Sequence, residues 1–440
     1  MKNKTINKSL IKKIPELSVP AGNLKILNYA IAYGADSVYV GGKSFNLRTL
    51  GQNFSIEKLK QATDIVHDKN KKIYLTLNAI ISECELNDLI NYLMQIKDIE
   101  FDAIIISDPG LLNLLKKFFP NTRIHISTQQ STSNHFAVNF WAELGVKRVN
   151  IARELSYEDI KKICSNSNIE IEVFVHGALC ISYSGRCLLS KYLIGRDANK
   201  GQCAHACRWK YYLMEEKRPN LFLPVIQDKR GTYILNSRDL CLIKKLDLIV
   251  DAGVAALKVE GRMKTENYVS TVTWAYRKAL DLIKDNKFDN QEKESLFKEL
   301  EKTSHRAFTE GFMFLKNEFL DNKDNNKNNK NSLYCDYAQQ LTENDNAGYI
   351  QNYKLLGSVE GYDKQFNGPI IKARNQVKIH SLINIIQPYK NALEFNLNNL
   401  IDFKTKNKIK IANTNDYIII PDIGSIDSFS IIKVKQNNRI

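Results

Sequence analysis

The fold can be predicted from residues 35–77, ADSVYVGGKSFNLRTLGQNFSIEKLKQATDIVHDKNKKIYLTL, which contain its repeating strand–helix–strand unit. Two short runs rich in β-branched residues, Ser37–Val40 and Ile73–Leu77, flank the amphipathic stretch Ile56–Asp68. In that stretch the apolar residues recur at spacings of three and four, as on one face of an α-helix. A strand, a helix and a second strand in this order predict two parallel strands with the helix packed outside the sheet.

The same alternation continues from residue 15 to about residue 275, with further amphipathic stretches at Asn23–Tyr33, Glu85–Ile96 and Phe136–Leu144. Eight β-like runs are found in all: Leu17–Val19, Ser37–Val40, Ile73–Leu77, Ala103–Ser107, Ile124–Ser127, Arg148–Ile151, Glu170–Val175 and Ala255–Glu260. Eight strands is the number that closes a (β/α)8 TIM-like barrel, so an α/β fold of this kind is predicted. An open doubly wound sheet is the structural alternative.

Other parts of the chain do not follow this alternation. About 80 residues separate Val175 from Ala255, far more than an ordinary βα connection has. We therefore expect the barrel, residues 15–310, to carry an insertion at about 176–254, above the strand ends where barrel active sites lie. Residues 1–14 are expected to be a basic extension, and the polar run at 321–331 predicts a flexible linker over 311–348. Short β-like runs, among them Leu355–Glu360 and Pro369–Ala373, then predict a small all-β domain at 349–440.

Composition narrows the class of protein. The chain of 440 residues is 43% hydrophobic with 20 Gly and 9 Pro, which excludes wholesale disorder and a collagen-like fold. It contains no apolar run long enough to span a membrane and no apolar secretory segment near its N-terminus, so a cytoplasmic location is expected. The net charge of +15 favours nucleic acid as a partner. The Lys- and Asn-rich composition is the alternative source of that charge.

The cysteines indicate a metal or redox site, because disulfides are rare in the cytosol. Four of the eight lie within 28 residues of the insertion: Cys180, Cys187, Cys203 and Cys207. Thiolates suit zinc or an iron–sulfur cluster, but this spacing matches neither the common zinc ribbon nor the ferredoxin pattern. Cys241 could replace one ligand or pack in the core. The remaining three are expected to be buried thiols without a site: Cys84, Cys164 and Cys335.

Several polar residues accompany these thiols. Glu172 and His176 lead into Cys180 and are expected, with Arg186, to be catalytic. His176 could transfer protons at the barrel mouth or be an ordinary hydrogen-bonded histidine. Arg186 and Arg208 could bind a carboxylate or phosphate with two hydrogen bonds. Four further cations are expected near the mouth, to contact RNA phosphate or a dicarboxylate, with solvation at the surface as the alternative: Arg48, Arg153, Arg262 and Lys264.

The stretch EVFVHGALCISYSGRCLLS at residues 172–190 resembles the signature of the collagenase-like, U-type peptidase family. The resemblance extends to ELSVPAGN at 16–23, the quoted segment at 35–48, NSRDLC at 236–241 and KVEGRMK at 258–264. It implies a barrel with a small C-terminal domain. The better understood members of this family are prephenate-dependent, iron–sulfur hydroxylases. One subgroup makes 5-hydroxyuridine at the tRNA wobble position, another hydroxylates an rRNA cytidine, and a third acts in ubiquinone hydroxylation.

The cysteine spacing here is similar to that of the tRNA subgroup. The resemblance therefore implies that Cys180, Cys187, Cys203 and Cys207 hold a 4Fe-4S cluster, with Cys241 as a substitute ligand and zinc as the alternative metal. It also implies prephenate as co-substrate and tRNA as partner, and leaves open a partner subunit or a homo-oligomer.

Two other functions remain as alternatives to this RNA-modifying enzyme. A peptidase could pair Cys180 or Cys187 with His176, but four grouped cysteines exceed what that chemistry needs, and no HExxH zinc motif occurs. A non-catalytic, zinc-stabilised RNA-binding protein is the third hypothesis. A barrel with a long insertion at its mouth favours catalysis over this third one.

Overall fold

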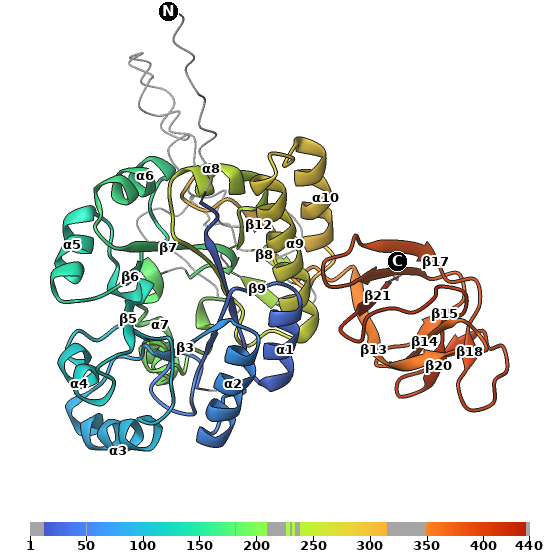
Figure 1. Ribbon diagram of the computed structural model, residues 1–440, viewed down its shortest axis with the longest axis horizontal. Helices are drawn as coiled ribbons and strands as arrows, with labels where there is room; N and C mark the ends of the chain where they lie inside the picture. Colours follow the sequence, from blue (N-terminus) through green and yellow to red (C-terminus); the bar gives the residue numbers. More distant parts are fainter. Residues whose placement is uncertain are drawn as a thin grey trace, which may run out of the picture.

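The computed structural model describes residues 13–49, 51–180, 182–208, 226–228, 231–233, 238–314 and 349–436. Eight parallel strands form a closed barrel, because β11 pairs with both β1 and β7 (Figure 1). The barrel strands are β1 (Glu16–Pro20), β2 (Ser37–Val40), β3 (Lys72–Leu77), β4 (Ala103–Ile106), β5 (Arg123–Ile126), β6 (Arg148–Asn150), β7 (Glu170–Ala178) and β11 (Ala256–Val259). All eight predicted runs are thus confirmed as strands, and the TIM-like barrel is confirmed against the open sheet.

Helices cover the outside of the barrel. They are α1 (Leu24–Ala32), α2 (Ile56–Asp68), α3 (Leu86–Ile96), α4 (Leu111–Phe118), α5 (His135–Glu143), α6 (Tyr157–Asn166), α8 (Leu246–Asp251), α9 (Glu266–Lys284) and α10 (Asn290–Leu300). Several begin where a polar side chain caps the first turn: Asn23 and Ser55 each accept a hydrogen bond from the backbone N–H three residues on. The outward strand residues, such as Leu17 and Leu75, are fully buried beneath these helices.

The insertion adds short elements above the strand ends. It contains the helix α7 (Leu189–Ile194), the 3-10 turns η3 (Tyr183–Gly185), η4 (Ala198–Lys200) and η5 (Ala206–Arg208), and a hairpin of β8 (Ile226–Asp228) and β9 (Gly231–Tyr233). Strand β10 (Asp239–Cys241) returns antiparallel to β7 and pairs with β12 (Phe308–Thr309). The insertion therefore starts from a β7 that extends three residues beyond the predicted run and rejoins the barrel along it.

The C-terminal domain is all-β, as predicted. Its sheet has seven antiparallel strands: β13 (Tyr353–Asp363), β14 (Gly368–Ala373), β16 (Leu382–Ile386), β17 (Leu393–Asn396), β18 (Ile401–Asp402), β20 (Tyr417–Ile419) and β21 (Ile431–Lys435). A separate pair joins β15 (Val377–Lys378) and β19 (Ile411–Ala412). The domain has its own apolar core around Leu356, Ile371 and Ile418. Strand β21 was not predicted, although it lies between β13 and β16.

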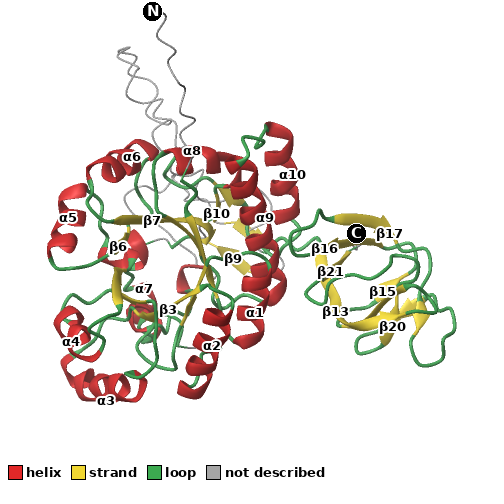
Figure 2. Ribbon diagram, in the orientation of Figure 1, coloured by secondary structure: helices red, strands yellow, loops and turns green. Residues whose placement is uncertain are grey.

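This domain packs beside α1, α9 and α10 (Figure 2). The Tyr33 hydroxyl of α1 donates to the Ile386 carbonyl at 2.9 Å, and the Trp274 indole N–H of α9 donates to the Lys390 carbonyl at 2.9 Å. The predicted extension, apart from residues 13 and 14, and most of the predicted linker (315–348) lie outside the described residues. Among the described helices, none combines the length and apolar character that crossing a bilayer requires.

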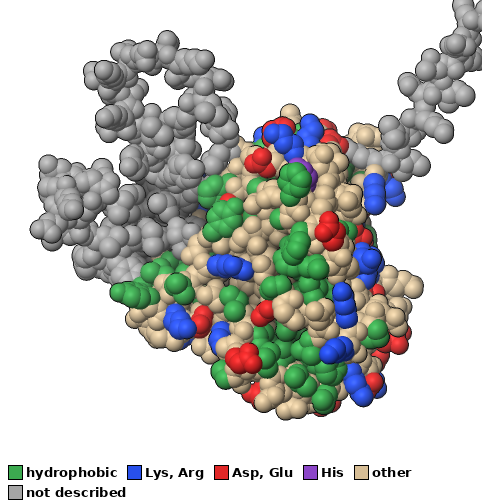
Figure 3. All heavy atoms as spheres, turned by 90° about the vertical axis from the view of Figure 1, so that its left-hand side faces the viewer, with side chains coloured by type: hydrophobic (Ala, Val, Ile, Leu, Met, Phe, Trp, Pro, Cys, Tyr) green, Lys and Arg blue, Asp and Glu red, His purple; other side chains and the backbone are tan. Residues whose placement is uncertain are grey.

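On the side of the barrel turned to the viewer in Figure 3, hydrophobic side chains lie among charged ones. Helix α5 contributes Phe136 and Phe140, one turn apart and 76% and 54% exposed. Exposed apolar residues are normal on soluble proteins.

Candidate functional site

A cavity of about 330 Å³ lies over the carboxyl ends of the barrel strands. Its floor is made by inward-facing side chains of six strands: Tyr39, Thr76, Ile105, Asn150, Phe174 and Lys258. Its walls come from the loops that follow the strands and from the insertion. This is the face of a parallel barrel on which catalytic sites are built.

The insertion brings its four grouped cysteines to this cavity. Cys180 follows β7, Cys187 precedes α7, and Cys203 and Cys207 lie near η5; all four line the same space. The backbone is tight here: Gly177 has a φ of +107°, and a Cβ at that position would lie 2.5 Å from the Glu260 carbonyl oxygen. The close packing of β7 against β11 thus sets where Cys180 emerges.

The chemistry of these donors fits a thiolate-held metal or cluster. Within the described ranges, however, no three His, Cys, Asp or Glu side chains lie close enough together to hold a metal ion. The insertion nevertheless provides four sulfur donors that line one cavity.

None of the other described cysteines lines this cavity. Cys241 is buried in the barrel core on β10, opposite His176, and burial raises the pKa of its thiol to about 12. Of the two expectations for Cys241, the structure shows core packing rather than a place among the ligands. Cys84 is exposed, so the expectation that it is buried was wrong, and Cys164 is partly buried. Cys335 lies outside the described residues.

Cations surround the same cavity. Arg48 forms an ion pair with Glu260 at 2.7 Å, and Arg262 donates to Thr76 Oγ1 at 2.7 Å and to Asn46 Oδ1. Burial, reinforced by the charge of Arg48, lowers the pKa of Arg262 to about 10. Burial alone would raise the pKa of Glu260, but the Arg48 guanidinium holds it below its usual value. This carboxylate is therefore ionised and orients Arg48.

Two more of the expected cations also line the cavity. Arg153 donates to the Ala178 carbonyl at 3.3 Å, and Lys264 donates to the Ser304 carbonyl at 3.3 Å. Lys258 completes the set but was not singled out from the sequence, although it lies in the predicted eighth run. The described lining thus carries five cations and one carboxylate, Glu260. Such an excess of positive charge suits a small anion with more than one carboxylate or phosphate.

Comparison with known proteins assigns the chain to a family. The model of peptidase family U32 matches residues 22–323. The chain belongs to peptidase family U32. It is 38% identical over 343 residues to the Haemophilus influenzae "tRNA hydroxylation protein P", covering 68% of this chain and 74% of that protein. It is 34% identical over 371 residues to the Bacillus subtilis "tRNA hydroxylation protein P1", covering 84% and 83%.

A more distant U32 relative has another RNA in its name. The Escherichia coli "23S rRNA 5-hydroxycytidine C2501 synthase" is 33% identical over 304 residues, covering 68% of this chain and 45% of that protein. The resemblance seen in the sequence is therefore confirmed at the level of the family, and the family match spans the insertion and the barrel after its first strand.

The structure does not bring His176 to the cavity of this U32 chain. Its ring packs against Tyr268 and Tyr276 of α9 and against Phe308, with centroids 5.5–5.8 Å apart. Burial lowers the pKa of His176 to about 3, so the ring is neutral. It fits the alternative of an ordinary hydrogen-bonded histidine, since its Nδ1 lies 3.4 Å from the Tyr276 hydroxyl oxygen. Among the described lining residues the histidine is His205, whose backbone N–H donates to Cys203 Sγ at 3.4 Å.

Glu172 lies inside the barrel, immediately below the cavity floor. Its carboxylate accepts a hydrogen bond from Asn150 at 2.8 Å and forms an ion pair with Lys258 at 2.8 Å. Glu172 is 2% exposed and does not line the cavity, whereas both partners do. It is therefore placed to hold Lys258 rather than to touch a bound molecule.

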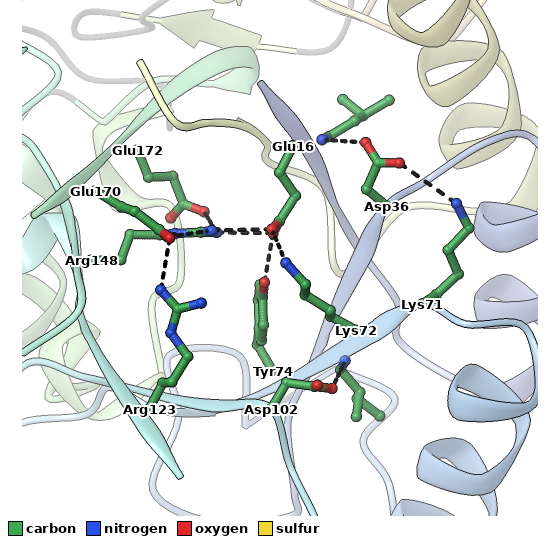
Figure 4. Close-up of polar contacts among 12 residues, drawn as sticks. Glu16, Asp36, Lys71, Lys72, Tyr74, Asp102, Arg123, Arg148, Glu170 and Glu172 are labelled. Atoms are coloured by element: carbon green, nitrogen blue, oxygen red, sulfur yellow. Dashed lines mark hydrogen bonds and ion pairs between the residues drawn. The ribbon is translucent and has the colours of Figure 1, made fainter. Parts of the chain in front are cut away.

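A charged network fills the barrel below Glu172 (Figure 4). Arg148, 2% exposed, reaches Glu16 at 2.9 Å, Glu170 at 2.7 Å and Glu172 at 3.7 Å. The Tyr74 hydroxyl donates to Glu16 at 2.6 Å. Burial would raise the pKa of Glu16, but Arg148 and Tyr74 lower it far below the usual value. The network keeps Glu16 and Glu170 ionised and supports the cavity floor from below.

The remaining two expected arginines are Arg186 and Arg208. Arg186 is exposed and donates from Nε to the Gln129 carbonyl at 2.5 Å and from a terminal nitrogen to Gln130 Oε1 at 3.3 Å. Since Gln129 lines the cavity, Arg186 ties the insertion to the loop after β5. The side chain of Arg208 lies outside the described residues.

Proposed function

We propose that this chain is an RNA-modifying enzyme that hydroxylates tRNA, forming 5-hydroxyuridine at the wobble position. One observation supports this most directly: four thiols and five cations surround a single cavity at the carboxyl end of a barrel. The two most similar relatives described above are named for tRNA hydroxylation. A wobble base lies in an unpaired loop, where a nucleotide can be turned out into a pocket. An enzyme that acts on tRNA would work in the cytoplasm.

Cys180, Cys187, Cys203 and Cys207 would hold a 4Fe-4S cluster, with zinc as the alternative metal. A cluster would supply the electron transfer that amino-acid side chains lack. The chain's own residues would bind and orient: Lys258 and Arg262 stand at the floor of the cavity, where they would hold a small dicarboxylate such as prephenate. Glu172 keeps Lys258 in place from below.

The test compares nucleosides from cells. A deletion strain is complemented with the native gene or with a Cys187→Ala variant, and tRNA and rRNA nucleosides are measured by mass spectrometry. We expect 5-hydroxyuridine in tRNA to disappear on deletion, to return with the native chain and to stay absent with the variant. Unchanged 5-hydroxyuridine in the deletion strain would refute the proposal.

The rRNA cytidine is the second candidate substrate, because of the name of the Escherichia coli relative. The same experiment separates the two: loss of 5-hydroxycytidine from rRNA with intact tRNA would favour it. Peptidase activity loses support from the position of His176, which packs against α9 rather than beside Cys180 or Cys187. Hydrolysis of gelatin by a Cys180→Ala variant, in the presence of chelator, would restore that alternative.

A further inference from the structure

A second hollow lies where the C-terminal domain meets the barrel. It has a volume of about 530 Å³ and is lined by Lys298, Glu301, Lys302, Asn352, Tyr353, Lys435 and Gln436. We call this hollow the basic groove. One wall is the C-terminal end of α10 with the two residues that follow, and the other wall is formed at β13 and the end of β21. Neither domain alone would form it.

Two short links place the basic groove close to the barrel cavity. Lys302 is two residues before Ser304, whose carbonyl accepts a hydrogen bond from the cavity residue Lys264. Tyr349 lines the cavity, and Asn352, three residues later, lines the groove. Since an extended chain advances at most about 3.3–3.6 Å per residue, the groove residue Asn352 lies within roughly 11 Å of the cavity residue Tyr349.

The charges of the groove are available to a ligand. Lys298 and Lys435 are exposed, and neither has an ion pair with any described residue. Lys302 is committed to Glu299 at 2.6 Å and Glu394 at 2.5 Å. With Glu301 as the one carboxylate of the described lining, the groove keeps an excess of positive charge.

A buried cation lies beside the groove. Lys433 precedes Lys435 by two residues on β21, so both point to the same face of the strand. Lys433 is fully buried, and its Nζ has no hydrogen-bond partner among the described residues. Burying an unpaired ammonium is costly. An anion seated in the groove would lower that cost.

We propose that the basic groove binds the phosphodiester backbone of the same RNA whose base enters the barrel cavity. This inference rests on the proposed function. Lysines supply the point charges that position a nucleic-acid backbone without reading its sequence. A strand with one nucleotide turned into the cavity continues outward on both sides, and the groove lies close enough to the cavity to receive one of these continuing segments. The C-terminal domain would then serve to hold RNA in register with the cavity.

The test measures binding of a full-length, unmodified tRNA transcript to the whole protein at several salt concentrations. The Lys298→Gln/Lys435→Gln double variant removes two exposed cations that make no ion pair with a described residue, so the fold should be retained. We expect its Kd to rise and the slope of log K against log salt to become shallower by about 1.4, or roughly 0.7 for each contact to a single strand. Iron and sulfide content and kcat should match the native protein, while KM for tRNA rises.

The matched control removes the same charge elsewhere on the same domain. Lys408 and Lys410 are exposed and do not line the groove. The Lys408→Gln/Lys410→Gln variant should keep the native slope. Equal losses in the two double variants would reduce the effect to net charge and overturn the inference, as would a native slope in the groove variant. If the native protein itself binds no tRNA, the proposed function fails at that point and the groove proposal fails with it.

Discussion

The ion pair between Lys258 and Glu172 offers a direct test of how the cavity floor is supported. We consider two nearly isosteric substitutions, Lys258→Met and Glu172→Gln. Each removes one charge of a pair whose side chains are about 6% and 2% exposed. The two substitutions do not leave the same remainder, because Arg148 also reaches Glu172, at 3.7 Å.

The distances set the expected costs. At an effective dielectric constant of about 20, the attraction is about 6 kcal/mol for the pair at 2.8 Å and about 4–5 kcal/mol for the pair at 3.7 Å, before the cost of burial is subtracted. Lys258→Met leaves Glu172 with Arg148 and Asn150, so we expect a loss of only ~1–2 kcal/mol. Glu172→Gln leaves Lys258 without a carboxylate partner among the described residues, and we expect a loss of ~3–5 kcal/mol.

Urea unfolding followed by circular dichroism at pH 7 measures these losses, with the double variant completing a thermodynamic cycle. The double variant should lose less than the sum of the single variants, because no unpaired ammonium remains. Titration calorimetry with prephenate provides the functional readout: Lys258→Met should abolish a binding heat that Glu172→Gln only weakens. A larger loss in Lys258→Met than in Glu172→Gln would show that Lys258 does not depend on Glu172. A loss in the double variant equal to the sum of the two single losses would show the same.

Three further results are expected. Cys187→Ala should lower bound iron and sulfide per chain to near zero, whereas Cys241→Ala should leave both unchanged; equal losses would place Cys241 among the ligands. Because burial lowers the pKa of His176 to about 3 from 6.5, the unfolded chain binds a proton that the native chain does not, so native stability falls as pH drops below about 6.5. This loss should amount to ~2–3 kcal/mol at pH 4.5, and His176→Gln should remove it when unfolding is measured at pH 4.5 and above pH 6.5. An unaltered pH dependence in the variant would contradict the burial of the ring. Burial likewise lowers the pKa of Lys433 to about 8 from 10.5, so native stability should rise with pH between those values. Lys433→Met should therefore stabilise the protein by ~2–4 kcal/mol at pH 7. A lower unfolding midpoint in the variant would show that the ammonium is paired.

Much of the barrel could be predicted because its signals are local. A strand such as Ser37–Val40 and a helix such as Ile56–Asp68 carry their period within a few residues, and the structure has both at the predicted bounds. The grouping of Cys180 and Cys187 with Cys203 and Cys207 was equally visible, since their place in one long insertion above the strand ends follows from chain order alone.

The failures concern direction and pairing between distant segments. His176 directly follows the predicted strand run and lies near the end of β7, yet its ring turns toward α9, where the register of β11 against β7 shifts between Lys258 and Val259. Glu172 and Lys258 are 86 residues apart and meet only because β7 and β11 close the barrel. The sequence of β21 is short and largely apolar, and the strand lies inside the sheet only because it pairs with β13 and β16, which are distant from it in the chain.

A barrel with a thiol-bearing insertion could be predicted from the residues alone, because periodicity and spacing are properties of neighbouring residues. Which charges support the cavity floor, that the His176 ring points away from the cavity, and that Lys298 and Lys435 share one groove could be seen only in the folded chain. These are consequences of strand closure and of one domain packing on another, and a contact across such a distance leaves no local pattern.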